Sequence, residues 1–153
     1  MSHRFLFYLS VMFFCIGCAN TNMEGRIAKQ AQRCNDKVCT VDISEFTDFD
    51  WDKLYIFNAS VSPEMIAEAV GSDSPEVLQY TRPWIFTKND KIVHAESNEE
   101  GIESVVEDEV LFHFPDSLKY QTYLRSQSLF RIIKQHDDKI PYYELYQIKR
   151  ANK

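Results

Sequence analysis

Short segments rich in aromatic and β-branched residues recur along this chain and are separated by turn-forming residues. Such residues fit a pleated, half-buried surface, so each segment predicts a β-strand. The predicted strands are residues 38–43, 54–57, 84–87, 92–94, 110–114, 129–133 and 140–148. Residues 117–127 are compatible with either a helix or a strand. This pattern constrains the fold most, because a chain with so many strands must build a sheet.

Two segments carry helix signals instead. Residues 23–33 show a weak helical periodicity of apolar residues. Residues 62–71 show a stronger pattern, because Ser62 is a favourable N-cap, Pro63 suits the first turn and Gly71 suits the end. The apolar stripe of this second helix is formed by Met65, Ile66, Ala69 and Val70. A further short helical turn is predicted at residues 74–76.

Composition and length predict one folded domain. The chain has 153 residues, of which 44% are hydrophobic and 26% are charged, and this balance excludes wholesale disorder. No internal repeat, low-complexity tract or second domain boundary is visible in the sequence. We therefore expect an α+β domain over residues 26–153. It should contain a single twisted, mainly antiparallel sheet of about five to seven strands, with one or two covering helices.

The amino terminus reads as a targeting signal. Arg4 precedes an apolar run over residues 5–16, which is shorter than the about 20 residues that span a bilayer. The run matches the apolar region of a signal peptide, and Gly17 and Cys18 follow it directly. This arrangement resembles the lipobox of bacterial lipoproteins, although Cys15 stands where that family usually has leucine. An ordinary signal peptide, in which Cys18 is incidental, is the alternative.

The lipobox resemblance implies a location. It implies a signal peptide over residues 1–17, a diacylglycerol on Cys18 and a flexible tether over residues 18–25. Ala19 replaces the aspartate that often retains lipoproteins at the inner membrane, so the resemblance implies the outer membrane, facing the periplasm. Lipid anchors of two or more chains hold durably, since each buried methylene contributes about 0.8 kcal/mol.

Two cysteines remain for the domain, namely Cys34 and Cys39. Exported proteins enter an oxidising space, and the turn-like residues between the two thiols favour a disulfide. Closing so small a ring stabilises the fold by about 2 kcal/mol. Two free thiols, or a redox or metal role, are the alternatives, but the spacing is not C-x-x-C and no further ligands lie nearby.

A second resemblance involves residues 49–57, which read Phe-Asp-Trp-Asp-Lys-Leu-Tyr-Ile-Phe and precede a Ser-Pro-Glu helix start. This core is similar to that of small uncharacterised exported bacterial proteins and lipoproteins with a Phe-x-Trp-Asp-Lys-x-Tyr-x-Phe motif. That family has no activity to transfer, so the resemblance supports only the location.

Three alternating acids, Asp48, Asp50 and Asp52, form one candidate site. They resemble the start of a calcium loop, but Lys53 and Ala59 occupy the places that require glycine and glutamate. Alternating carboxylates also suit acid–base catalysis on one strand face. The simpler interpretation is a strand entry with its acids in water.

The histidines and glycines give no catalytic pattern. The candidate metal or catalytic histidines are His94, His113 and His136, and none has the spacing of a zinc site. Glycine-lined serine elbows and phosphate-binding loops are also missing from the sequence. We therefore expect no metal, no cofactor, no nucleotide and no catalytic residue.

A run of acidic residues gives the second candidate site. It contains Glu96, Glu99, Glu100, Glu103, Glu107, Asp108 and Glu109 and no basic residue. One interpretation is a solvated loop with an outer strand face. The other is an acidic binding surface that attracts a basic partner.

Charge and location together favour a binding function. The net charge is −6, and removing Arg4 with the signal leaves 16 basic against 23 acidic residues, or −7. This balance argues against a nucleic-acid partner. The sequence favours a lipid-anchored envelope protein that binds a basic protein, for example as an inhibitor or an immunity partner of a toxin. The alternatives are an envelope enzyme that uses the three aspartates or His113, and a purely structural lipoprotein.

Overall fold

The computed structural model describes residues 22–34, 39–59, 61–71, 82–97, 106–115 and 117–149. The predicted signal peptide, the lipidation site at Cys18 and the predicted helical turn at residues 74–76 lie outside these residues. No helix in the described part of the chain is long and apolar enough to cross a membrane.

The described residues form an α+β fold, as predicted. In chain order the elements are α1 (Met23–Arg33), β1 (Cys39–Asp42), the 3₁₀ helix η1 (Ile43–Glu45), β2 (Lys53–Phe57), α2 (Pro63–Val70), β3 (Trp84–Lys88), β4 (Lys91–Glu96), β5 (Val110–Phe112), β6 (Tyr120–Leu124), the 3₁₀ helix η2 (Arg125–Gln127), β7 (Leu129–Asp137) and β8 (Ile140–Gln147). The ambiguous stretch 117–127 thus contains a strand and a short 3₁₀ helix.

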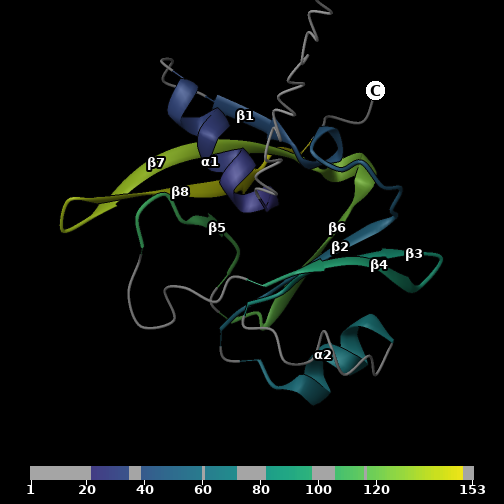
Figure 1. Ribbon diagram of the computed structural model, residues 1–153. Coiled ribbons are helices and arrows are strands. Elements are labelled where there is room, and N and C mark those ends of the chain that lie inside the picture. The colour runs from purple at the N-terminus through teal and green to yellow at the C-terminus, as the bar shows by residue number, and fades with distance from the viewer. Residues whose placement is uncertain are drawn as a thin grey trace, which may run out of the picture.

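The eight described strands form two sheets of four, so the expectation of a single sheet of about five to seven strands is wrong. Sheet A has the order β1-β7-β8-β5 and sheet B has the order β4-β3-β2-β6. All neighbours are antiparallel except β5 and β8, which are parallel. Figure 1 shows one sheet above the other, with α2 below sheet B. Apolar alternation predicts which face of a strand is buried, but it does not predict which strands pair, and this explains the error.

The main core lies between the inner faces of the two sheets, and α1 packs into the same cluster. Its large members include Ile27 from α1, Trp51, Leu54, Phe86, Phe130, Tyr143 and Leu145. A second cluster lies on the outer face of sheet B, where Ile66 and Val70 of α2 pack against Tyr55, Phe57 and Ile85. Strands β2 and β3 are therefore buried on both faces, as their nearly continuous apolar sequences require.

Local sequence signals explain the ends of the elements. The Ser62 side chain accepts a hydrogen bond from the Met65 amide at 3.4 Å, and Gly71 ends α2 with φ of +69°. This φ favours glycine, because a residue that carries a Cβ is strained in this conformation. Asn89 and Asp90, at φ of +49° and +57°, form the tight turn of the predicted β3–β4 hairpin.

Helix α1 begins at Met23, within the stretch 18–25 that was predicted as a tether. The Asn22 side chain caps α1 by accepting a hydrogen bond from the Gly25 amide at 2.9 Å, and Met23 is only 3% exposed. In the structure, Asn22 thus caps α1 and residues 23–25 form its first turn. The prediction of a tether rested on the polar composition of residues 19–25. Composition does not reveal the Asn22 cap or the buried Met23 side chain.

Candidate functional site

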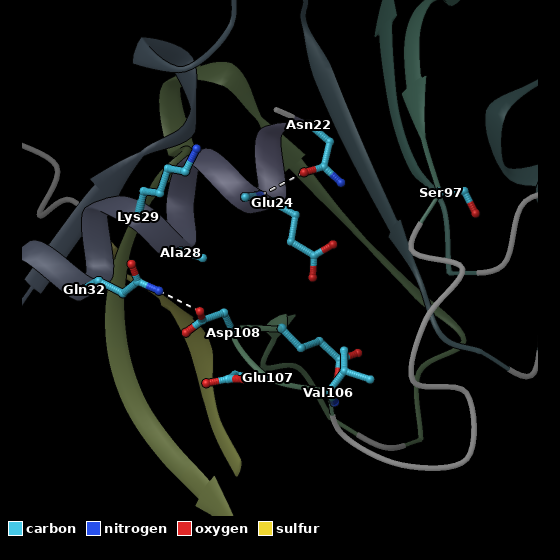
Figure 2. A pocket seen from close by; sticks show the side chains of 11 residues that line it. Asn22, Glu24, Ala28, Lys29, Gln32, Ser97, Val106, Glu107 and Asp108 are labelled. Carbon is cyan, nitrogen blue, oxygen red and sulfur yellow. Dashed lines mark hydrogen bonds between the residues drawn. The ribbon is translucent and has the colours of Figure 1, made fainter. Parts of the chain in front are cut away.

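A cavity of about 480 Å³ opens along one face of α1. We call it the α1 pocket. Its polar and charged lining residues are Asn22, Glu24, Lys29, Gln32, Ser97, Glu107, Asp108 and Glu109. Figure 2 shows Glu24 reaching from α1 towards the segment 106–109, with Ser97 on the other side. Four carboxylates and one ammonium group therefore line the cavity, which makes its wall acidic.

Glu24 is the half-buried carboxylate of the α1 pocket. Its Oε1 accepts a hydrogen bond from the Val110 amide at 2.9 Å, which joins α1 to β5. Burial raises the pKa of Glu24 to about 6, and the nearby charges of Glu109 and Glu96 act in the same direction. The Val110 amide and the Arg82 charge lower this pKa but do not compensate for burial. Glu24 therefore takes up a proton at a higher pH than an ordinary glutamate does.

Glu96, at the end of β4, holds the N-terminus of α1. Both of its carboxylate oxygens accept from the Met23 amide, at 3.2 and 2.9 Å. A carboxylate at this place satisfies a free amide and complements the positive end of the helix dipole. The His94 Nε2 lies 2.9 Å from Glu96 Oε1 and fixes the orientation of the carboxylate. Glu96, the first residue of the acidic run, therefore has a structural role and is not among the residues that line the α1 pocket.

Glu109 forms an ion pair at the base of the α1 pocket. Its Oε1 lies 2.7 Å from Arg82 Nη2, and its side chain is only 1% exposed. The Val106 amide donates to the other carboxylate oxygen at 3.3 Å. A charge this deeply buried requires such a partner. Glu109 therefore orders the segment that carries the exposed acids and offers little charge to solvent.

The rim of the α1 pocket carries the accessible acids. Glu107 is exposed, and the half-buried Asp108 accepts a hydrogen bond from Gln32 Nε2 at 2.6 Å. Lys29 is exposed on the opposite side and is the only basic residue among the described residues of the lining. An open cavity of this charge suits a guanidinium or ammonium group, which can bond several carboxylate oxygens at once.

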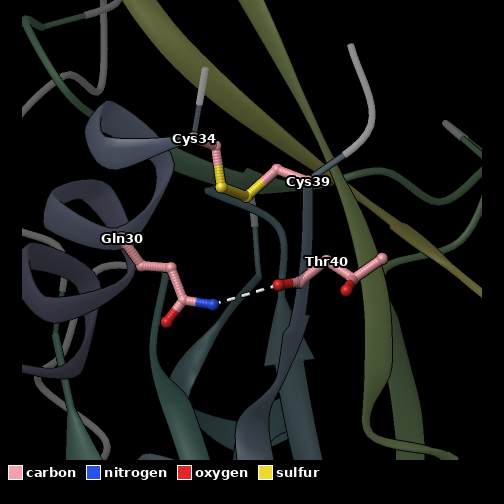
Figure 3. Close-up of a disulfide and its surroundings, with 4 residues drawn as sticks. All are labelled: Gln30, Cys34, Cys39 and Thr40. Carbon is pink, nitrogen blue, oxygen red and sulfur yellow. Dashed lines mark hydrogen bonds between the residues drawn. A yellow bond between two sulfur atoms is a disulfide. The ribbon is translucent and has the colours of Figure 1, made fainter. Parts of the chain in front are cut away.

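A disulfide fixes the other end of α1, as predicted. Cys34 follows the helix and Cys39 begins β1, and their sulfur atoms are bonded with a Cα–Cα distance of 5.9 Å (Figure 3). Beside the bond, Gln30 Nε2 donates to the Thr40 carbonyl at 3.0 Å. The helix that lines the pocket is therefore held at its N-terminus by Glu96 and at its C-terminus by the disulfide.

The acidic run is divided by the fold. Glu99, Glu100 and Glu103 lie outside the described residues. Among the other four, Glu96 and Glu109 are held in hydrogen bonds and ion pairs, and Glu107, Asp108 and the buried Glu109 line the α1 pocket. In the described part of the run, Glu107 and Asp108 thus form an accessible wall of the α1 pocket, and the buried Glu109 holds this segment in place.

The predicted aspartate cluster forms a surface ion-pair network, and none of its members lines the α1 pocket. Asp50 pairs with Lys88 at 3.1 Å and also with Arg125, while Asp52 pairs with Lys88 at 2.9 Å. Asp48 is exposed. The hydrogen bond and charge of Lys88 lower the pKa of Asp50, and the Asn89 amide with Lys88 lowers that of Asp52. These acids stay ionised and tie the start of β2 to the β3–β4 turn.

The three candidate histidines occupy different environments. His94 pairs with Glu96 in sheet B, whereas the His113 ring stacks on Tyr146 in sheet A at a centroid distance of 4.3 Å. His136 is exposed near the end of β7. In the described residues, no group of three or more histidine, cysteine or acidic side chains is arranged to hold a metal ion.

Sequence reasoning missed Glu24 and Arg82. Glu24 falls in the stretch expected to be a tether, and the signal that reveals it is the Asn22 cap followed by an acid in the first helical turn. Arg82 carries no local signal, because its partner Glu109 is distant in the sequence.

Comparison with protein-family models, with curated protein sequences and with solved structures finds no significant match.

Proposed function

We propose that this protein is a lipid-anchored envelope protein that acts by binding a basic protein, as an inhibitor or immunity-type partner. The observation that supports it best is the α1 pocket, a cavity of about 480 Å³ with a largely acidic lining. The anchor is Cys18, and the resemblance of residues 5–18 to a lipobox supports it. The Cys34–Cys39 disulfide suits an oxidising compartment.

The recognised group is a lysine or arginine side chain of the partner. Glu107 and Asp108 provide carboxylates at the mouth, and Glu24 provides one deeper inside. A cation that enters beside Glu24 also favours its ionised form, so binding and ionisation support each other. The net charge of −6 adds long-range attraction for a basic partner.

Charge-neutralising variants of the pocket test this proposal. The full chain in detergent is immobilised, and its affinity for a basic lysozyme is measured at about 0.1 M and about 1 M salt, where the Debye length falls from about 10 Å to about 3 Å. Glu107→Gln with Asp108→Asn removes two rim charges, and Asn also tolerates the Asp108 φ of +63°. We expect about 5- to 30-fold weaker binding at low salt.

The matched control is Glu45→Gln with Asp48→Asn, which removes the same charge from exposed positions away from the pocket. This control should bind like the unchanged chain. Equal losses in both double variants would show that only net charge matters, and binding that survives high salt undiminished would contradict an electrostatic site.

A further inference from the structure

Among the residues that the structure describes, strand β6 is a sheet edge with no neighbouring strand on its outer side. The described strands leave four edges, β1 and β5 of sheet A and β4 and β6 of sheet B. Soluble proteins protect such edges with charges, prolines, bulges or short strands. β1 has four residues and ends in Asp42, β5 has three residues, and β4 carries charges and a register shift against β3. β6, Tyr-Gln-Thr-Tyr-Leu, has none of these devices.

The backbone of β6 presents hydrogen-bonding groups outward. The Lys119 carbonyl accepts from the Asn58 amide, and the Arg125 amide donates to the Asp52 carbonyl, both at 3.0 Å. Along an antiparallel strand, only every second residue forms backbone hydrogen bonds to a given neighbouring strand. Since Lys119 and Arg125 bond on the β2 side, the backbone N–H and C=O groups of Tyr120, Thr122 and Leu124 point away from β2. Among the described residues, the Gln121 side chain donates from Nε2 to the Thr122 carbonyl at 3.2 Å, and this carbonyl can accept a second hydrogen bond.

The side chains of this edge are apolar and exposed. Tyr120 is 37% exposed and Leu124 is 44% exposed, and together with Leu118 they make up three of the six exposed large apolar residues in the described chain. Tyr120, Thr122 and Leu124 share one face of sheet B, where the Tyr120 ring lies 5.3 Å from that of Phe57. An uncharged edge with exposed apolar side chains is a surface for strand pairing.

We propose that β6 pairs antiparallel with β6 of a second copy of this chain, about a two-fold axis at Thr122. The pairing extends sheet B continuously from one copy into the other. Thr122 then exchanges two backbone hydrogen bonds with Thr122 of the second copy, and Leu124 donates to the carbonyl of Tyr120 of the second copy. Such an interface is isologous, as two-fold contacts between identical chains must be.

Self-complementarity identifies the occupant as a second copy. In this register each exposed Tyr120 side chain lies against Leu124 of the other copy, on the same face, so one contact covers both apolar residues. Lys119 then faces Arg125 of the other copy, but Arg125 is already paired with Asp50, which reduces the repulsion. The interface contains no other charges, so it should respond weakly to salt, unlike binding at the α1 pocket.

Cysteine cross-linking of the full chain tests this pairing. Opposed residues of a hydrogen-bonded antiparallel pair lie about 5.5 Å apart at Cα, within the range of a disulfide. We expect Thr122→Cys to give a covalent dimer on mild oxidation. The matched control Val93→Cys, also exposed on an edge strand at 42%, should give no covalent dimer, and neither should the parent chain. Adding Leu124→Lys to Thr122→Cys should reduce the dimer about 10-fold.

Three outcomes would overturn the proposal. They are a monomeric Thr122→Cys chain, equal cross-linking of Val93→Cys, and capture of a different protein by Thr122→Cys. The Glu107→Gln, Asp108→Asn variant should dimerise normally, because the α1 pocket does not contribute to β6. Failure of the basic-partner proposal therefore leaves this result unaffected.

Discussion

The two groups of acids in this domain have the same side-chain chemistry and opposite environments. Asp50 and Asp52 stand at the surface beside Lys88, and their pKa values are lowered. Glu24 stands inside the α1 pocket, and burial raises its pKa to about 6. The aspartates are the more conspicuous motif in the sequence, yet the glutamates lie beside a cavity. Environment, and not the spacing of acids, separates a surface network from a candidate site.

Removing the buried ion pair should have the largest effect. Glu109→Gln removes the buried carboxylate that lies 2.7 Å from the Arg82 guanidinium, whose side chain is only 16% exposed. We expect a loss of about 3 kcal/mol in the free energy of unfolding, measured in denaturant. Asp50→Asn, which breaks surface pairs, should change the unfolding midpoint little. Equal losses would contradict the distinction between the two groups.

Removing the disulfide should have the next largest effect. Replacing both Cys34 and Cys39 by serine should cost about 2 kcal/mol, because the bond restricts the unfolded chain. It should also loosen the end of α1, so that the pKa of Glu24 moves towards its usual value while that of Asp52 stays lowered. Carboxyl NMR titration measures both. An unchanged Glu24 pKa would show that the disulfide does not support the pocket.

Glu24 should make the domain less stable as pH rises. Its folded pKa of about 6 exceeds the usual 4.5, so the folded state binds the proton more tightly. The stabilisation that protonated Glu24 contributes is fully present below pH 4.5 and is lost as pH rises through about 6. The free energy of unfolding should fall by about 1–2 kcal/mol over this range. Glu24→Gln, which stays neutral, should remove this slope from the pH dependence of the unfolding free energy. A variant with the parent's slope would contradict the raised pKa.

Asp52 should show the opposite and smallest dependence. Its pKa is lowered by the Asn89 amide and Lys88, so its stabilisation is present above the usual pKa of 3.8 and is lost as pH falls through the lower folded value. Asp52→Asn should therefore lie slightly below the parent chain in stability at neutral pH and converge with it in acid. A difference that grows in acid would reverse the assigned sign.

Local elements were predictable because their signals are local. The Ser62 cap and Gly71 stop delimit α2, and the residue pair Asn89-Asp90 forms the turn of a hairpin. The division into two sheets was not predictable, because it depends on long-range pairing. Strand β5 joins β8 in parallel, and no turn between them encodes that contact.

The candidate site was predictable only in part. The acidic run drew attention to Glu107 and Asp108, which line the α1 pocket. It also suggested exposed charge at Glu96 and Glu109, which instead cap a helix and pair with Arg82. These contacts join residues that are far apart in the chain, so neither periodicity nor composition predicts them.

Carboxyl NMR during addition of a basic lysozyme tests the central claim, that the α1 pocket binds a cationic group. We predict that the signals of Glu24, Glu107 and Asp108 shift together and saturate, and that those of Asp50 and Asp52 stay in place. Shifts that are equal in both groups, or confined to Asp50 and Asp52, would contradict it.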